Sequence, residues 1–468
     1  MSDGWKNVLI IIITLILGYL ITLLPFPETF SRDAILMLSI AFIAVVFWIT
    51  ECIPIYVTAL VIMFLQGVLG IQPIGDVLGY IASPVNTIVL AGFVIAAAFS
   101  TYDLDARFSL HVISIMGNKT RNLALGAMLS TALLSMWIAN TAAAAIMVPI
   151  GVGILEIESR EKRQDSNLGK VMLIGIGYAA HIGGIGTPAG TTVAPITIAF
   201  LEDMAGIHIS FLEWMLRGVP VVILLTPLAW FILSFVIYPL KNEKIGGGRE
   251  VVSNQLQRLG GLKRGQKHVI FLFFVSILLW VADSFLPLLD DWLYIASLII
   301  VFMFLAPVIG VISWEEAEEE IGWGVFILVG GGLALGSGLE KTGIISMVGG
   351  FLANILVNSP FILIIIAIGL LSAISITLLS SVTATSSTVV PIAITLALRF
   401  GMDVSQFAMV SAFGASLAFL LPITPPNAIS YKHDYFDSYD MTRAGVPAVI
   451  LAVLVIGAVF GLLHIVSA

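Results

Sequence analysis

Charged side chains are scarce in this sequence. Asp, Glu, Lys and Arg make up 11% of its 468 residues, whereas soluble domains average about 25%. Hydrophobic residues account for 59%, more than a soluble core can bury, so the chain is expected to be an integral membrane protein. The net charge of −8 offers nucleic acid no basic face. A single cysteine, Cys52, excludes an internal disulfide.

Acidic residues are absent from the middle of the apolar runs. Cation exchangers driven by carboxylates usually need such acids inside the membrane, so their absence argues against that class. An enzyme would need converging bases, nucleophiles or metal ligands, and six His and one Cys provide little for one. We therefore expect no enzyme. An ion channel is the other alternative, but it has no need of paired interrupted helices.

Two uncharged runs, 123–155 and 361–398, are too long for single membrane helices. Each has a polar cluster near its middle, Asn140-Thr141 in the first and Ser380 to Thr383 in the second. A spanning helix needs about 20 residues, and the arms of the first run, about 16 residues each, reach only about 24 Å. Both runs are therefore predicted to be re-entrant helical hairpins.

Two further apolar runs, 171–201 and 404–430, contain clusters of helix-breaking residues. The first holds Gly183 to Thr192, and the second holds Leu421 to Asn427. Glycine and proline at this density interrupt the backbone hydrogen bonds of a helix. Unpaired backbone at membrane depth survives only against protein or a wet cavity. Two broken helices are predicted, each following one hairpin.

The hairpins are related by an internal repeat. Thr141-Ala142 recurs as Thr383-Ala384, and Val148-Pro149-Ile150 recurs at the same offset as Val390-Pro391-Ile392. Five crossings lie between the copies, and an odd number inverts the second one. The predicted fold is all-α and integral to the membrane, an inverted-repeat transporter with about 11 transmembrane helices. Its parts are N-terminal helices 1–53, a first repeat 54–240, a cytoplasmic linker 241–267 and a second repeat 268–468.

The distribution of basic residues predicts the orientation. With the N-terminus in the cytoplasm, most of the 21 Lys and Arg residues fall on the inner side. Only Arg32, Arg217, Lys341 and Arg399 fall outside. This agrees with the positive-inside rule and predicts a multi-pass protein of the cell membrane with an extracellular C-terminus.

The hairpin tips carry amides and hydroxyls but no charge. The arms that begin at the tips present helix N-termini, which favour a carboxylate or another anion. Two related pockets would suit a dianion with charge at each end. Alternatively, these side chains only cap buried half-helices. His181 precedes the first break and is the one ionisable group deep in a repeat; it is either a counter-charge or proton site, or a neutral packed side chain.

Several stretches of this sequence resemble the divalent anion:sodium symporter family, from about residue 45 to residue 445. The combination is specific, although no single stretch would be. The matching stretches are Thr50 to Pro54, Trp314 to Ala317, Trp323 to Val325, Gly330 to Gly336, Leu339 to Gly343 and Thr424 to Ala428.

The resemblance implies transport of di- and tricarboxylates or sulfate by a homodimer, with hairpins and broken helices sliding as an elevator. In the family, Ser-Asn-Thr tips and broken helices build the sodium and substrate sites. Carried over, this implies a sodium ion near Asn140 and Gly186. The implied substrate residues are Asn140, Thr141, Thr191, Ser381, Thr383, Thr424, Pro425, Pro426 and Asn427.

Both tips depart from the family pattern. Ala139 stands where the first serine is typical, and Val382 stands where the second asparagine is typical. These changes remove two side-chain ligands for sodium and favour dicarboxylate exchange, with C4-type substrates of the succinate, malate and 2-oxoglutarate class. The alternative is a sodium-coupled symporter of di- or tricarboxylates or sulfate. The expected partners are dicarboxylate anions, membrane lipid and a second copy of the chain, with no nucleic acid; sodium is the one candidate cofactor.

Overall fold

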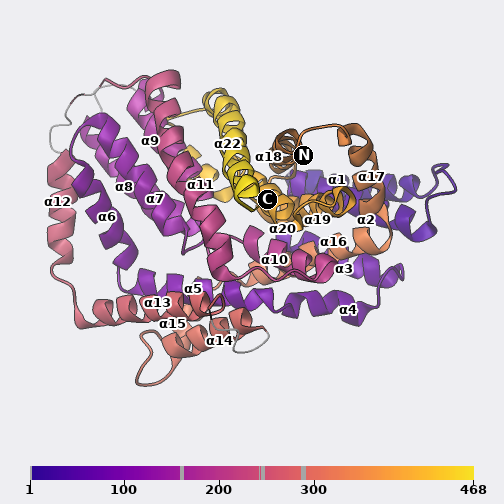
Figure 1. The fold of residues 1–468 in the computed structure, drawn as a ribbon. Helices are drawn as coiled ribbons and strands as arrows, with labels where there is room; N and C mark the ends of the chain where they lie inside the picture. The colour runs from indigo at the N-terminus through magenta and orange to yellow at the C-terminus, as the bar shows by residue number, and fades with distance from the viewer. Residues whose placement is uncertain (1–2, 159–162, 242, 244–247, 286–290, 468) are drawn as a thin grey trace. The chain divides into compact units, whose positions relative to one another are not determined.

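The computed structural model describes all residues except 1–2, 159–162, 242, 244–247, 286–290 and 468, and every regular element in the described part is helical (Figure 1). The chain forms two compact units, each assembled from separate segments. Unit 1 comprises residues 1–86, 195–209 and 322–415, and unit 2 comprises 87–194, 210–321 and 416–468. Each unit therefore combines parts of both halves of the chain, and the predicted repeat boundaries stay a prediction.

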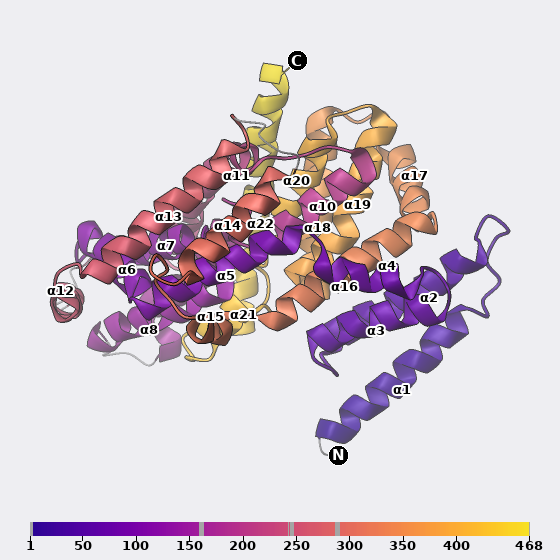
Figure 2. The same ribbon diagram turned by 90° about the horizontal axis from the view of Figure 1, so that it is seen from below.

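Unit 1 contains the N-terminal helices and the second hairpin. Helices α1, α2 and α3 pack in sequence order and lie side by side in both ribbon views (Figures 1 and 2). The elements are α1 (Asp3–Ile21), α2 (Arg32–Thr50), α3 (Ile55–Val68), α4 (Ile74–Gly79), η1 (Tyr80–Ala82), most of α10 (Val193–Ala205), α16 (Trp323–Lys341), α17 (Ile344–Leu356), α18 (Phe361–Leu379), α19 (Val382–Phe400) and α20 (Val404–Ala415).

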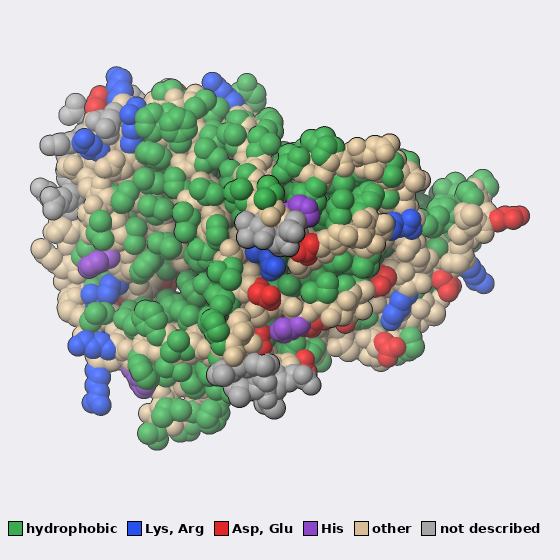
Figure 3. Space-filling view, in the orientation of Figure 1, with side chains coloured by type: hydrophobic (Ala, Val, Ile, Leu, Met, Phe, Trp, Pro, Cys, Tyr) green, Lys and Arg blue, Asp and Glu red, His purple; other side chains and the backbone are tan. Residues whose placement is uncertain are grey.

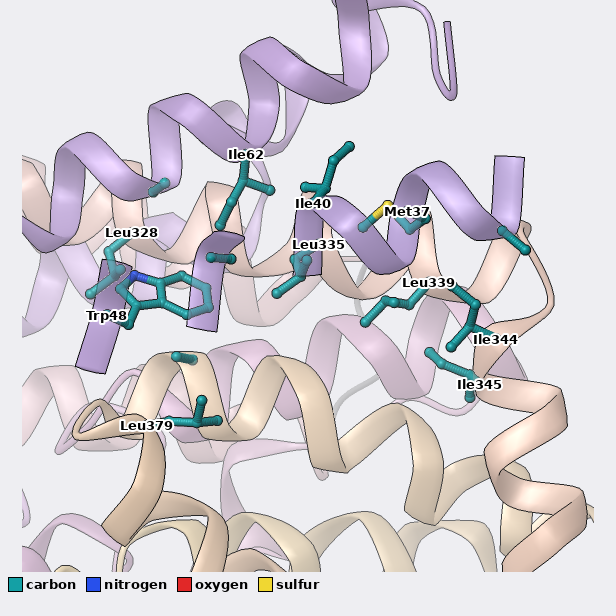
Figure 4. Packing of buried hydrophobic residues seen from close by; sticks show 14 residues of the cluster. Met37, Ile40, Trp48, Ile62, Leu328, Leu335, Leu339, Ile344, Ile345 and Leu379 are labelled. Carbon is teal, nitrogen blue, oxygen red and sulfur yellow. The ribbon is translucent and has the colours of Figure 1, made fainter. Parts of the chain in front are cut away.

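The core of unit 1 forms where α2, α3 and α16 meet. Trp48, Ile62 and Leu335 each expose 1% of their surface and belong to one buried cluster (Figure 4). Leu379, at the end of α18, joins the same cluster. The second hairpin is thus anchored at its turn by apolar contacts with the helices of its own unit.

Unit 2 contains the first hairpin and the C-terminal helix. Helix α11 packs against α7, α9 and α22 and continues into a π-helical turn, η3. The elements are α5 (Val85–Thr101), α6 (Leu104–Met116), α7 (Thr120–Ser135), α8 (Asn140–Glu158), η2 (Arg163–Asp165), α9 (Asn167–Gly184), α11 (Phe211–Phe231), η3 (Ile232–Ile237), α12 (Gly248–Leu259), α13 (Arg264–Ala282), α14 (Trp292–Leu305), α15 (Trp314–Glu320), α21 (Pro425–Tyr431) and α22 (Ser438–Ser467).

The surface is apolar in the manner of a membrane protein. Nine helices of the described residues are long and apolar enough to cross a bilayer, and both arms of the second hairpin are among them. Hydrophobic side chains cover most of the face in Figure 3, with charged ones sparse between them. Leu278, for example, exposes 68% of its surface. Such exposure is stable only against lipid.

Both predicted hairpins and both predicted broken helices are present. Helices α7 and α8 form the first hairpin, and α18 and α19 form the second. The first broken helix stops after Gly184 and resumes as α10, and the second stops after Ala415 and resumes as α21. In each unit the first half of the broken helix packs on the preceding hairpin, α9 on α7 and α8, and α20 on α18 and α19.

The predicted linker 241–267 contains a helix that the sequence analysis did not anticipate. Helix α12 occupies 248–259 and packs on α6. Both terminal nitrogens of the Arg107 guanidinium donate to its last carbonyls, those of Leu259 and Gly260, at 2.8 and 2.9 Å. Residues 242 and 244–247 of the linker lie outside the described residues.

Candidate functional site

The turn of the first hairpin places a serine and an asparagine side by side. Helix α7 ends at Ser135, and α8 begins at Asn140. The Ser135 hydroxyl is buried and donates to the carbonyl oxygen of Ala180 on α9 at 2.7 Å. Its oxygen lies 2.8 Å from the Asn140 side-chain amide. The turn is therefore bound to α9 through a side chain that directly precedes it.

The hydrogen-bond network assigns the orientation of the Asn140 amide. Because the Ser135 proton is already committed to Ala180, the amide nitrogen faces this side. There it donates to the Ser135 hydroxyl at 2.8 Å and to the carbonyl oxygens of Ala180 and Gly190 at 3.2 Å each. A Cβ at Gly184 would lie 2.4 Å from the nearest amide atom. Only glycine allows Asn140 this approach to α9.

The first break, between α9 and α10, interlocks with the same turn. The Thr187 hydroxyl donates to the carbonyl oxygen of Met136, and the backbone nitrogen of Ala189 donates back to Thr187 at 3.2 Å. Gly186, a predicted neighbour of sodium, packs against the Met136 side chain. The carbonyl of Gly190, four residues further on, is the one that reaches Asn140.

The second break, residues 416–424, rests on another part of α9. The His181 Nε2 lies 2.9 Å from the Thr424 hydroxyl oxygen. The Asn427 amide nitrogen donates to the carbonyl oxygen of Ala418 at 2.6 Å and so closes the break. Its amide oxygen comes so near α9 that a Cβ at Gly177 would lie 2.3 Å away. Helix α9 thus contacts both the first hairpin and the second broken helix.

These contacts follow one face of α9. Positions separated by four and then three residues lie in one row on a helix. The predicted residues of the first tip and of the second break therefore reach neighbouring positions of a single helix. The pairs, in order along α9, are Gly177 with Asn427, His181 with Thr424, and Gly184 with Asn140.

The second hairpin tip belongs to unit 1. Ser381 is the N-cap of α19, and its hydroxyl accepts from the backbone nitrogen of Ala384 at 3.3 Å. This is the capping role that the sequence analysis left open as an alternative. Thr383 exposes 2% of its surface, and its methyl group faces Gly332 of α16. The hydroxyls from Thr385 to Thr388 donate to carbonyls of their own helix.

The other predicted residues lie beside these contacts. Thr141 is exposed at the start of α8, and Thr191 is half-buried in the first break. Pro425 and Pro426 occupy the first turn of α21, where a missing backbone N–H costs nothing. Among the described residues, no group of three or more His, Cys, Asp or Glu side chains is placed to hold a metal ion. The atoms that could bind a cation at this site are uncharged oxygens of hydroxyl, amide and backbone carbonyl groups.

Sequence reasoning missed Ser135, Thr187 and Gly190. Ser135 was overlooked because the family pattern directs attention to position 139, where alanine stands. The signal that could have found Ser135 is its position one helical turn before the tip, since the side chains of residues near a helix end lie over the last turn of that helix. Thr187 and Gly190 were included only as part of the Gly- and Pro-rich break, without individual roles.

Hairpins paired with broken helices, joined by neutral polar contacts inside a lipid-facing protein, define a secondary transporter. The chain belongs to the sodium:sulfate symporter family: the family's model, described as "Sodium:sulfate symporter transmembrane region", matches residues 3–466. The resemblance noted in the sequence is therefore confirmed. Membership also confirms that the protein is a transporter and not an enzyme.

Curated relatives match almost the whole chain. The sodium-dependent dicarboxylate transporter SdcS of Staphylococcus saprophyticus is 32% identical over 470 residues, covering 95% of this chain and 90% of the relative. The protein of the same name from Staphylococcus aureus strain USA300 is 33% identical over 459 residues, covering 93% and 87%.

Two solved structures share the fold. The YdaH transporter of Alcanivorax borkumensis superimposes with a TM-score of 0.55 at 11% identity, covering 99% of this chain and 98% of that one. MtrF of Neisseria gonorrhoeae, described as illuminating a class of antimetabolite efflux pumps, gives 0.56 at 12% identity, covering 98% and 94%. At this identity the likeness concerns the fold alone.

Proposed function

We propose that this protein is a sodium-coupled symporter of C4-type dicarboxylates. The relatives named sodium-dependent dicarboxylate transporters support both the substrate class and the coupling ion. The structural observation that carries the proposal is the group of oxygens around the Asn140 amide. It comprises the Ser135 hydroxyl and the carbonyls of Ala180 and Gly190.

This oxygen group has the chemistry of a sodium site. Hard cations of low charge are held by carbonyl, hydroxyl and amide oxygens, and half-helix ends and unwound backbone supply them in transporters. In the proposed sodium-bound state the Asn140 side chain moves back from these oxygens and turns its own amide oxygen toward the ion, which takes its place among them. The same three oxygens then bind a cation in place of an N–H donor.

The expectation of exchange loses part of its basis. It depended on two missing ligands, the serine replaced by Ala139 and the asparagine replaced by Val382. Ser135 provides a hydroxyl at the first tip, so the asparagine replaced by Val382 at the second tip is the one ligand of the two that is still missing. The relatives give the exchange interpretation no support, and sodium coupling, earlier the alternative, becomes the leading proposal.

The electrical cost of import also favours co-transported cations. A dianion entering a cell that is negative inside opposes about 2.3 kcal/mol per charge per 100 mV. Sodium ions that enter with it offset this cost. In the proposed cycle, Asn140 and Thr141 bind one carboxylate and Ser381 and Thr383 the other. Hairpins and broken helices move as an elevator within a homodimer.

Uptake into sealed vesicles tests the proposal. Purified protein is reconstituted into liposomes that are either empty or loaded with unlabelled succinate, and labelled succinate is offered with an inward sodium gradient or an equal potassium gradient. We expect accumulation with sodium only, and inhibition by unlabelled malate but not by sulfate. Uptake that requires internal dicarboxylate and ignores sodium would restore the exchange interpretation, and inhibition by sulfate alone would change the substrate class.

A further inference from the structure

We propose that His181 is a positioning residue that sets the geometry of the second break by holding the hydroxyl of Thr424. The proposal concerns how the site is built, and it rests on the proposed function only for its transport readout. His181 is 1% exposed, and its Nε2 lies 2.9 Å from the Thr424 hydroxyl oxygen. Within the described part of the chain, that is its one hydrogen bond, and Nδ1 is buried without a partner.

The bond diverts Thr424 from its usual local role. Thr424 is the N-cap residue of α21, and an N-cap threonine normally accepts a hydrogen bond from a backbone N–H of the first turn. Here the hydroxyl makes no such bond. Pro425 and Pro426 have no N–H, so Asn427 is the first residue able to provide one. The Thr424 hydroxyl, as it is oriented, thus reaches the histidine and not the first free N–H of its own helix.

His181 holds the Thr424 hydroxyl on the side that faces α9. It lies on the face of α9 between Gly177 and Gly184, whose missing side chains admit Asn427 and Asn140. Holding Thr424 on this face keeps the second break against the same helix as the first tip. Loss of the imidazole would release the hydroxyl to cap α21 and would leave the break free to move away from α9.

A neighbouring contact provides a matched control. Tyr178, also on α9, stacks on Phe419 with 4.3 Å between ring centroids. Its hydroxyl donates to the carbonyl oxygens of Phe419 and Met441 at 2.7 and 3.2 Å. Tyr178→Phe therefore removes a hydrogen bond between α9 and the second break, and one between α9 and α22, but leaves Thr424 in place. It separates a general loosening of the contact from a specific effect on Thr424.

The transport experiment is a double-mutant cycle at saturating sodium. His181→Ala and Thr424→Val are each expected to raise the KM for succinate about tenfold, with Vmax changed less than twofold. The double variant should show the same tenfold change, because either substitution removes the one bond. His181→Gln, which can reach Thr424 with its amide, should restore KM to within about threefold. Tyr178→Phe should lower the melting temperature and leave KM unchanged.

A second readout does not depend on transport. Cys52 is the one cysteine, so Cys52→Ser provides a background for Ile423→Cys within the second break. We expect His181→Ala and Thr424→Val each to raise the rate of maleimide labelling at position 423 at least fivefold, and the pair to do no more. Additive effects in either readout, or an unchanged labelling rate in His181→Ala, would overturn the proposal. If the labelling rates change as expected but the parent protein takes up no succinate, the proposed function is contradicted and the role of His181 is not.

Discussion

The hydroxyl of Ser135 lies 2.8 Å from the side-chain amide of Asn140, across the turn between α7 and α8. The same hydroxyl donates to the Ala180 carbonyl. One small side chain therefore joins the end of one helix, the start of the next and the body of a third. A site of this kind is sensitive to single atoms, since each oxygen in it has an assigned partner.

Ser135→Ala should weaken sodium binding. The substitution removes one proposed ligand, and it takes one hydrogen-bond partner from the Ala180 carbonyl and one from the Asn140 amide. This costs about 1–2 kcal/mol, or about five- to thirtyfold in the sodium concentration for half-maximal uptake. Ser130→Ala is the control, because Ser130 lies on the same helix and bonds only to the Ser109 carbonyl. Equal sodium dependence in both variants would exclude Ser135 from the site.

Gly184→Ala should abolish transport and lower the melting temperature. Its Cβ would lie 2.4 Å from the Asn140 amide, so the amide would have to move away from the three oxygens that it contacts. Gly153→Ala is the matched control within a helix, because nothing lies within 4 Å of its Cβ position. That change should stabilise α8 by up to about 1 kcal/mol. Thermal unfolding in detergent is followed for both variants. A melting temperature of Gly184→Ala equal to that of the parent protein would contradict this account.

Removing one partner of the Lys170–Asp440 ion pair should be strongly destabilising. The two charges are 2.8 Å apart with side chains 17% and 13% exposed, and the Tyr238 hydroxyl also reaches Asp440. Asp440→Asn leaves the lysine charge uncompensated, at a cost of about 3 kcal/mol.

The double variant Lys170→Met/Asp440→Asn should recover at least half of that loss, because no unpaired charge is left. Glu156→Gln is the control for an exposed pair, since Glu156 and Arg163 are 3.6 Å apart and about half exposed. It should change the unfolding free energy by less than about 0.5 kcal/mol. A double variant as unstable as Asp440→Asn would show that the charge imbalance is not the cause.

Asp105 should make stability depend on pH. Burial at the start of α6, with the charges of Asp103 and Glu320 as smaller contributions, raises the pKa of Asp105 from 3.8 to about 6. An acid whose pKa is raised by folding stabilises the fold fully below pH 3.8, and this stabilisation is lost as pH rises to about 6. The shift corresponds to about 3 kcal/mol at most.

Asp105→Asn removes that titration. The variant should match the parent protein near pH 4 and melt at a higher temperature at pH 7.5. Asp103→Asn, an exposed change one residue before α6, should only move the midpoint of the parent profile slightly lower. Melting temperatures measured from pH 4 to pH 8 provide the comparison. Parallel profiles for Asp105→Asn and the parent protein would exclude Asp105 as the group responsible.

The sequence predicted the hairpins and broken helices because their signals are local. The first hairpin is an example, because its run of uncharged residues is too long for one helix and has Asn140 near its middle. Such a run can adopt few structures in a bilayer. Proline and glycine clusters end helices wherever they occur. These features depend on chain length and backbone chemistry, which a single sequence displays directly. The helix in 248–259 was missed because the segment is polar and contains no apolar run.

The contacts of the site were less predictable because they join distant segments. Gly184 belongs to the cluster predicted to break the helix, yet it lies within α9 and, like Gly177, admits an asparagine to the face of that helix. The pairing of His181 with Thr424 spans more than half of the chain and leaves no local pattern. Ser135 was hidden by the substitution at position 139, since only the folded turn shows that a preceding residue reaches the same place.

The contacts of α9 with the second break determine when this site can form during synthesis. Tyr178 donates a hydrogen bond to the carbonyl of Met441. This contact can form only after nearly the whole chain has been synthesised, although Tyr178 itself is made in the first half of translation. Until then, the polar face of α9 and the first hairpin lie in the bilayer without their final partners. Ribosome-bound chains stopped after the second hairpin should thus be degraded by membrane proteases faster than chains extended through α22. The order in which helices leave the translocon is accordingly as much a constraint on this sequence as the stability of the finished protein.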